Sequence, residues 1–312
     1  MSSLNQAFTR MGMRRRYEAW FLRFGLADRS GAWWLRYLLM NPGRAGCPRI
    51  ENAAPVQVWA TWFPRAGSPE TFIQEFSIDA LRLGRDPFFL ETGHNRIDDA
   101  SCRGRLDVRG HQISWDLRYN STFSVTLSHK GWIGFSRTPH SDAVFSGEIR
   151  LDDKIVRGEP LGFGLQGHNC GFRHRHFWTW MHACFPQADG GLSTFEALVY
   201  EMPFGLVFRK AILRHRGRSF IFRKLADSCR DRKAMRWAFR ASGVAGSVEV
   251  EVDGGGPSLH RLPYINTNCA GSFEVANNSL ALARLLLRLN GSATAAEFGT
   301  DGGAVLEMTG DY

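Results

Sequence analysis

The sequence has none of the short motifs that identify the common nucleotide-dependent and serine-dependent enzymes. It contains no P-loop, no GxSxG nucleophile elbow and, among its six cysteines, no CxxC pair. The wide cysteine spacing gives no sign of a disulfide framework, so we expect a reducing compartment. We also expect no redox cofactor and no bound metal.

Long apolar runs are missing as well. No stretch approaches the ~20 apolar residues that a membrane-spanning helix needs. Arg23 interrupts "AWFLRFGLA" before a signal-peptide core can form, and the same missing core weakens the match of "RRR" at 14–16 to a twin-arginine signal. We therefore predict a cytoplasmic protein, with a peripheral position on the inner face of the membrane as the alternative.

Acidic residues are scarce in two segments. The net charge is +9, but residues 1–50 alone carry +7 and residues 209–240 carry +10, so the remainder is acidic. Such basic patches are typical of surfaces that contact membrane headgroups, an acidic partner or nucleic acid, and solvated arginine-rich faces explain them equally well. Of these partners we retain an anionic membrane surface and expect no nucleic acid.

Helical periodicity is nearly absent, whereas glycine and large aromatic residues are abundant. The 312 residues include 33 glycines, 23 phenylalanines and 10 tryptophans, a profile that indicates a mostly β protein with many turns. Only residues 4–26 follow helical spacing, and they predict a basic N-terminal helix that packs on the protein or lies on a membrane surface. Residues 279–289 fit either a helix or a buried strand.

Alternating patterns predict strands every eight to twelve residues, which indicates antiparallel barrels or sandwiches. Hairpins are expected to turn at Arg109-Gly110 and Asp152-Asp153. We predict an all-β fold of two consecutive antiparallel lipocalin-like barrels behind the N-terminal helix. The expected divisions are 1–28 for the helical segment, 29–186 for the first barrel and 187–312 for the second. The strands are expected at 32–40, 56–63, 71–78, 104–119, 144–160, 192–202, 205–225, 234–242, 247–254, 271–277 and 304–310.

The stretch "GLQGHNCGFRHRHFWTWMHACF" (164–185) is the richest in chemistry. With a period of two, Trp178, Trp180, His182 and Cys184 share one strand face, which we predict to be the wall of a ligand cavity. The residue types that zinc accepts occur here too, but without a clip such as CxxC or HxxxH. We therefore favour a cavity wall over a metal site. The potential ligands are Cys170, His174, His176, His182 and Cys184.

Buried polar groups beside these rings are the candidates for catalysis. His168 and Asn169 would orient an acid or a water, or alternatively pin a loop through backbone hydrogen bonds. Glu196 has apolar neighbours, and burial would raise its pKa and keep it protonated near neutral pH. Asp116 in "SWDLRY" is the second candidate acid. For both carboxyls, a salt bridge to arginine is the alternative.

Several segments, taken together, resemble the carotenoid 1,2-hydratase and tocopherol-cyclase-like superfamily of two-domain lipocalin-like proteins. The most specific is "QGHNCG" followed by "WTW", which contains Gln166, His168, Asn169, Trp178 and Trp180; Cys170 stands where the family commonly has an aromatic residue. The others, in chain order, are "WWLRY" (33–37), "SWDLRY" (114–119), "FE" (195–196) and "GSFEVANNSLALA" (271–283).

The resemblance implies a large apolar pocket and the acid-assisted hydration, cyclisation or isomerisation of an isoprenoid or polyketide-like molecule. We expect Glu196, or else Asp116, to deliver the proton. The ligand-binding residues that we expect are Trp34, Gln166, Trp178, Trp180 and His182. A carrier of hydrophobic ligands without catalytic activity is the alternative function.

Overall fold

The described part of the chain folds into strands, short 3₁₀ turns and loops. The computed structural model describes residues 4–51, 53–129, 133–172, 177–188, 190–201 and 205–310. The 3₁₀ turns described from end to end are Pro42–Arg44 and Ile78–Ala80, and these ranges contain no α-helix. The all-β prediction is confirmed, and no helix in the described part of the chain is long and apolar enough to cross a membrane.

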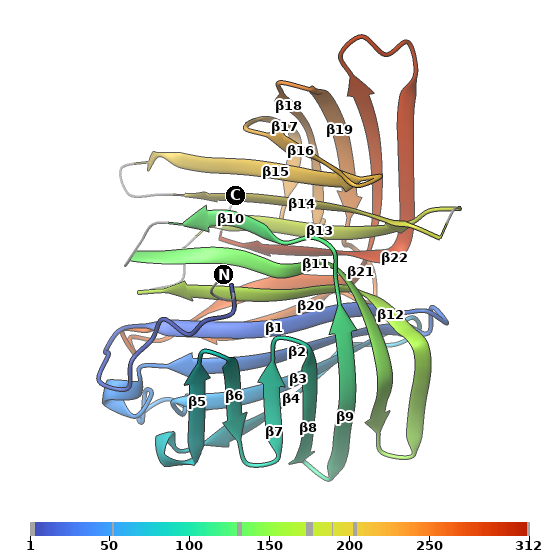
Figure 1. Cartoon of the computed structure of the whole chain (residues 1–312). Helices are drawn as coiled ribbons and strands as arrows, with labels where there is room; N and C mark the ends of the chain where they lie inside the picture. The colour runs from blue at the N-terminus through green and yellow to red at the C-terminus, as the bar shows by residue number, and fades with distance from the viewer. Residues whose placement is uncertain are drawn as a thin grey trace.

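The first half of the chain forms a twelve-stranded antiparallel sheet, sheet A, at the bottom of Figure 1. The spatial order is β4-β3-β2-β1-β12-β11-β9-β8-β7-β6-β5, and β10 pairs with β11. The sheet curls until β4 packs against β8, which nearly closes a barrel. Its strands are β1 (Tyr17–Leu26), β2 (Gly31–Met40), β3 (Val56–Pro64), β4 (Glu70–Phe76), β5 (Leu81–Arg85), β6 (Phe88–Thr92), β7 (Asn95–Asp98), β8 (Ser101–Val108), β9 (His111–Asn120), β10 (Val125–His129), β11 (Gly134–Leu151) and β12 (Lys154–Gly171).

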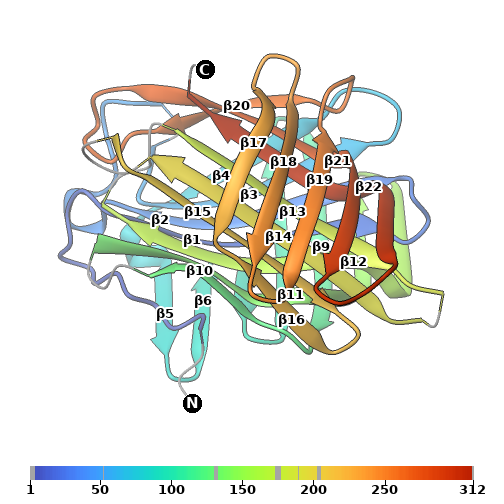
Figure 2. The same ribbon diagram turned by 90° about the horizontal axis from the view of Figure 1, so that it is seen from above.

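The second half forms a ten-stranded antiparallel sheet, sheet B. Its order is β16-β15-β14-β13-β22-β21-β19-β18-β17, and β20 pairs with β21. Seen from above, β17, β18 and β19 cross steeply over β13, β14 and β15 (Figure 2). The second barrel stays a prediction. The strands are β13 (Trp178–Pro186), β14 (Leu192–Glu201), β15 (Val207–His215), β16 (Arg218–Phe222), β17 (Lys224–Asp231), β18 (Arg236–Gly243), β19 (Gly246–Asp253), β20 (His260–Ile265), β21 (Ser272–Leu289) and β22 (Ala295–Thr309).

The expected hairpins and strands agree closely with these elements. Arg109 and Gly110 have positive φ at the β8–β9 turn, and Asp152 has positive φ at the β11–β12 turn. The ambiguous segment 279–289 lies within β21. β13, which the sequence analysis assigned to the first barrel, pairs with β14 and β22 of sheet B.

The predicted N-terminal helix at 4–26 is wrong. Residues Tyr17–Leu26 form β1, and described residues 4–16 contain no helix. Trp20, Leu22 and Phe24 point into the core of sheet A, while Phe21 faces sheet B, so both faces of β1 are apolar. A strand buried on both faces has no polar side, and its apolar residues then match helical spacing by coincidence.

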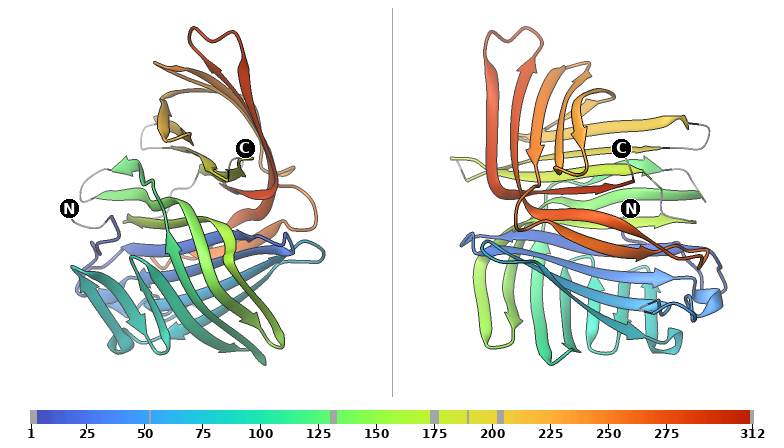
Figure 3. Two further views of the ribbon diagram at one scale, coloured as in Figure 1. Left: turned by 45° about the vertical axis from the view of Figure 1, so that its right-hand side comes forward. Right: turned by 180° about the vertical axis from the view of Figure 1, so that it is seen from behind.

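Three large apolar cores, with a smaller cluster around Leu38 and Met40, organise the molecule. One fills the inside of sheet A and contains Trp20 and Tyr37, and another fills the inside of sheet B and contains Trp237. The third lies between the outer faces of the two sheets and contains Trp34 and Trp180. The two stacked bodies are clear in Figure 3. The functional site described below belongs to this third core.

Two buried polar side chains join the sheets. Arg23 of β1 is buried, and its pKa is lowered to about 10 by burial, so its guanidinium is still charged at neutral pH. His182 of β13 contacts the backbone carbonyl of Ser141 through Nε2, at 2.7 Å, and burial lowers its pKa to about 3. Both residues therefore connect sheet A to sheet B from the middle of the interface. The guanidinium of Arg23 donates to the backbone carbonyls of Ser279, Gly302, Gly303 and Ala304.

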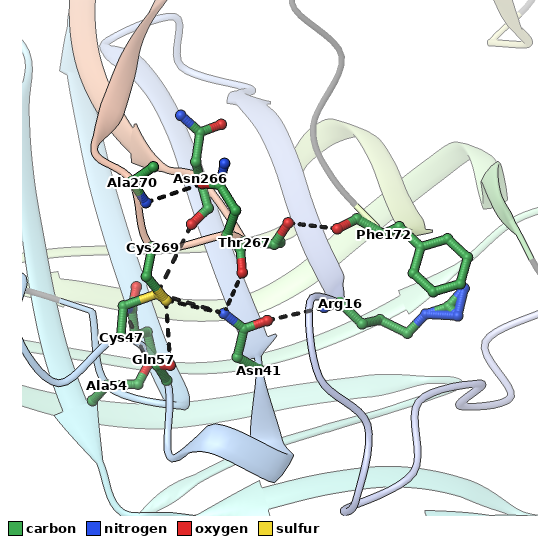
Figure 4. The surroundings of a disulfide bond; sticks show 12 residues. Arg16, Asn41, Cys47, Ala54, Gln57, Phe172, Asn266, Thr267, Cys269 and Ala270 are labelled. Atoms are coloured by element: carbon green, nitrogen blue, oxygen red, sulfur yellow. Dashed lines mark hydrogen bonds between the residues drawn. A yellow bond between two sulfur atoms is a disulfide. The ribbon is translucent and has the colours of Figure 1, made fainter.

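A disulfide links the sheets at one end, contrary to our expectation from the cysteine spacing. Cys47 follows β2 and Cys269 precedes β21, 222 residues further along the chain (Figure 4). Asn41 supports the same junction, because its Nδ2 donates to the carbonyl of Thr267 at 2.8 Å. The cysteine spacing did not predict this disulfide, because the two cysteines are distant in sequence and only the fold brings them together. The cysteines that are free are Cys102, Cys170, Cys184 and Cys229.

Candidate functional site

A cavity of about 640 Å³ lies between the two sheets. Its walls come from β1, β2, β11 and β12 of sheet A and from β13, β14, β20 and β22 of sheet B. At one end the lining includes the exposed side chains of Arg15, Ile133 and Phe172, so the cavity opens to solvent there. A volume of this size suits a small organic molecule.

Three aromatic rings form a contiguous apolar floor. The ring of Phe21 lies edge-on to the indole of Trp34, with centroids 6.3 Å apart, and to that of Trp180, at 6.0 Å. Gly167 allows this arrangement, because a Cβ at this position would lie 2.2 Å from Cζ of Phe21. The glycine of the "QGHN" element therefore makes room for a ring of the cavity floor.

The carboxyl of Glu196 is buried and lines the cavity from β14. Its Oε1 accepts hydrogen bonds from Trp180 Nε1 at 2.9 Å and from Thr138 Oγ1 at 2.8 Å. Its Oε2 has no hydrogen-bond partner. Burial raises the pKa of Glu196 to about 7, although the two hydrogen bonds and the charge of Lys210 act to lower it. Near neutral pH this group can therefore hold a transferable proton.

A second buried carboxyl, Glu307 of β22, lines the same cavity. Its Oε1 accepts a hydrogen bond from Trp178 Nε1 at 2.8 Å, and its Oε2 accepts one from Asn277 Nδ2 at 3.3 Å. Burial raises the pKa of Glu307, against the opposing effects of these hydrogen bonds and of Arg36. Strand β13 thus presents two indoles, each of which binds a carboxyl on a neighbouring strand.

Trp178 and Trp180 line the cavity, but His182 on the same strand face does not. His182 lies further along β13 and is fully enclosed by the junction with β11. Trp34, the other predicted ligand-binding aromatic, also lines the cavity, and its indole Nε1 is buried without a hydrogen-bond partner. The predicted aromatic wall therefore includes three indoles.

The "QGHN" residues divide between the two faces of β12. Asn169 lines the cavity, and its Oδ1 has no hydrogen-bond partner. His168 points into sheet A, where its Nε2 lies 2.8 Å from Glu18 Oε1 and its Nδ1 lies 2.8 Å from the carbonyl of Leu4. Gln166 is on the same inner face and donates to Asn5 Oδ1. His168 and Gln166 therefore hold the segment that precedes β1, and neither lines the cavity.

Glu18 completes this internal network on β1. It is buried, and its carboxylate accepts hydrogen bonds from the backbone N–H groups of Phe8 and Thr9. Burial acts to raise the pKa of Glu18, but the bond to His168 and these backbone bonds together hold it below the ordinary value. The sequence could not identify this pairing, because Glu18 and His168 are 150 residues apart.

Asp116 lies outside the cavity. It is exposed on β9 and borders a separate surface groove with Arg118 and Glu148. Of the two candidate acids, Glu196 is therefore the one that lines the apolar cavity.

No cluster of three or more metal-ligating side chains occurs among the described residues. Cys170 and Cys184 are buried, and burial raises the pKa of each thiol to about 12, so neither is ionised near neutral pH. His174 and His176, the other potential ligands, lie outside the described residues.

Two further residues of the cavity were missed by sequence reasoning. Arg36 is 5% exposed, and its guanidinium lies over the rings of Trp59, at 4.9 Å, and Tyr264, at 4.3 Å. Glu307 was missed although the strand at 304–310 was expected. Alternation within "WWLRY" puts Arg36 and Trp34 on the same strand face, and this pattern could have identified Arg36 as a cavity residue. Glu307 had no comparable signal, because its place beside Trp178 depends on the register of β13 with β22.

No family model and no curated protein matches the sequence. Solved structures do share the fold. Kievitone hydratase from Nectria haematococca is 10% identical with a TM-score of 0.58, and the alignment covers 99% of this chain and 95% of that one. A protein assigned as AttH from Nitrosomonas europaea is 12% identical with a TM-score of 0.55, covering 95% and 92%. CghA is 11% identical with a TM-score of 0.57, covering 95% and 88%.

At identities of 10–12% the likeness extends to the fold and not to any one reaction.

Proposed function

We propose that this protein binds a large apolar molecule, isoprenoid or polyketide-like, in the cavity between its two sheets and promotes its acid-assisted hydration, cyclisation or isomerisation. The observation that carries the proposal is the carboxyl of Glu196. It lines an aromatic cavity, has one oxygen without a partner and has a pKa raised to about 7. The hydratase among the structures that share the fold supports this class of reaction.

In the proposed reaction Glu196 transfers its proton from Oε2 to an alkene carbon or a carbonyl oxygen of the ligand. The resulting carboxylate keeps the hydrogen bonds from Trp180 and Thr138, which stabilise its charge. The faces of the aromatic floor attract the cation that develops on the ligand. In a hydration, the water oxygen bonds to the cationic carbon and the surplus proton returns to the carboxylate, so the enzyme is regenerated.

Asn169 would orient such a water, because it lines the cavity and its side-chain oxygen has no hydrogen-bond partner. A buried acceptor of this kind is normally satisfied by a ligand or an ordered water. His168 would contribute indirectly, since it holds the segment before β1 and does not line the cavity.

The test begins with a ligand co-purified from the native host and identified by mass spectrometry. Glu196→Gln keeps the shape of the side chain and removes the transferable proton, so turnover of that ligand is expected to fall at least 100-fold while its Kd stays nearly unchanged. In the wild type, turnover is expected to fall as the pH rises through about 7, because the acid loses its proton.

Asp116→Asn is the matched control, because it removes an exposed carboxyl outside the cavity. Full turnover by Glu196→Gln would refute the acid role. If wild type and variant bind the ligand equally and neither converts it, the protein acts as a carrier, which is the alternative function.

A further inference from the structure

The polar groups at the two sides of the cavity are chemically different. On the face of sheet A, Arg36 belongs to β2, whereas Thr138, which binds Glu196, belongs to β11. Strands β1 and β12 lie between them in the sheet. Three strand spacings of about 4.8 Å place the two sides about 14 Å apart.

The opposite wall repeats this division. In sheet B the order is β14, β13, β22 and β21, so Glu196 lies at one side and Glu307 towards the other. Tyr264 of β20, which packs on β21, completes the side of Arg36. The aromatic floor of Phe21, Trp34 and Trp180 occupies the space between the two sides.

Arg36 is a buried cation that forms no ion pair among the described residues, although its charge acts on the carboxyl of Glu307. Its guanidinium lies over the rings of Trp59 and Tyr264 and also forms a hydrogen bond with the side chain of Tyr264, and within the described ranges it forms no ion pair with a carboxylate. The nearby carboxyl of Glu307 is instead occupied by Trp178 and Asn277. A buried charge of this kind is costly unless a counter-ion or strong acceptor satisfies it.

Other groups on this side are donors too. Trp34 is two residues before Arg36 on the same face of β2, and its indole N–H lacks an acceptor. Burial raises the pKa of Glu307, whereas its hydrogen bonds and the charge of Arg36 act to lower it. At the open end the cavity is lined by Arg15 and Arg137, and the carboxylates of the lining are the two buried glutamates. An anionic ligand would thus be attracted at the entrance and paired inside.

We propose that Arg36 binds an anionic oxygen group, a carboxylate, enolate or phenolate, at one end of an otherwise apolar ligand. The guanidinium and the indole N–H of Trp34 donate hydrogen bonds to this group. The apolar body crosses the aromatic floor, and the reactive atoms reach Glu196 on the far side. The inference rests on the proposed function, because it takes the same cavity as the ligand site and names the substrate class: an acidic amphiphile about 10–14 Å long.

The test compares two probes of equal length, decanoate and 1-decanol, by isothermal titration calorimetry at pH 8. A hydrogen-bonded charge pair in a buried site corresponds to a preference of about 10- to 100-fold, so decanoate is expected to bind the wild type that much more tightly. Arg36→Met keeps the length of the side chain without its charge, and should bring the ratio of the two affinities close to one. Arg36→Lys should restore part of the preference.

Arg157→Met, which removes an exposed arginine outside the cavity, is the matched control and should keep the wild-type ratio. Equal binding of both probes by the wild type would overturn the anion site whether or not Arg36→Met folds. An unchanged ratio in a folded Arg36→Met protein would do the same. Binding of neither probe would overturn the cavity as a ligand site, and the proposed function with it. The turnover of Glu196→Gln separately decides the acid role.

Discussion

Replacing Glu196 by glutamine should change how the stability of the protein depends on pH, and this can be measured without a substrate. In the folded protein the pKa of Glu196 is raised from an ordinary value of 4.5 to about 7. A difference of one pKa unit between folded and unfolded states corresponds to about 1.4 kcal/mol, so Glu196 accounts for about 3 kcal/mol in total.

The direction of this pH dependence follows from whether the folded or the unfolded state holds the proton of Glu196. Between pH 4.5 and 7 the folded protein keeps the proton of Glu196 while the unfolded chain has released it. The contribution of Glu196 to the free energy of unfolding is therefore fully present below pH 4.5, decreases as the pH rises, and is lost above about pH 7. His182 acts in the opposite direction at low pH, because its pKa is lowered to about 3. Because His182 is present in both the wild type and Glu196→Gln, its contribution cancels when the two free energies of unfolding are subtracted.

The assay is urea denaturation of the wild type and Glu196→Gln at pH 5, 6, 7 and 8. Relative to the variant, the wild type should lose about 2.5 kcal/mol of unfolding free energy between pH 5 and pH 8, because part of the total contribution is already lost at pH 5. Asp116→Asn should follow the wild-type profile, because its carboxyl is exposed on β9. Parallel profiles for the wild type and Glu196→Gln would show that the buried carboxyl titrates as an ordinary one, and the argument for a stored proton would fail.

Three other variants test the frame around the cavity. Arg23→Met should lower the free energy of unfolding by about 3–5 kcal/mol in urea denaturation, because backbone carbonyls of sheet B lose a charged donor; a loss below 1 kcal/mol would contradict this role. Cys47→Ser with Cys269→Ser should lower it by about 2–5 kcal/mol, and non-reducing mass spectrometry of the wild type checks that the bond exists. Gly167→Ala should displace the ring of Phe21 and weaken binding of an apolar fluorescent probe more than it lowers Tm; unchanged binding would contradict the floor.

Short sequence patterns predicted the features that depend on residues close together in the chain. Alternation and turn residues placed most strands, and positive φ at Gly110 and Asp152 matches the expected hairpins. The aromatic face of Trp178 and Trp180 was predicted for the same reason, because strand pleating alone puts side chains two residues apart on one face. Glu196 was identified from its apolar neighbours, which is again a local signal.

What the sequence did not disclose depends on contacts between distant strands. The pairing of Trp178 with Glu307 joins residues 129 positions apart, and Cys47 bonds to a cysteine 222 positions away. The error at 4–26 has a different origin. A strand buried on both faces carries no alternation, so its sequence was compatible with either periodicity.

The position of the cavity between the sheets constrains how its selectivity can change. Each sheet has its own apolar core, so substitutions inside either sheet can accumulate without altering the ligand site. The third core is different, because residues that line the cavity also hold the two halves together. A ligand that fills this space acts as part of the interface, and its binding energy opposes separation of the halves. Adaptation to a larger substrate would therefore weaken the junction between the halves, unless contacts such as those of Arg23 were strengthened in compensation.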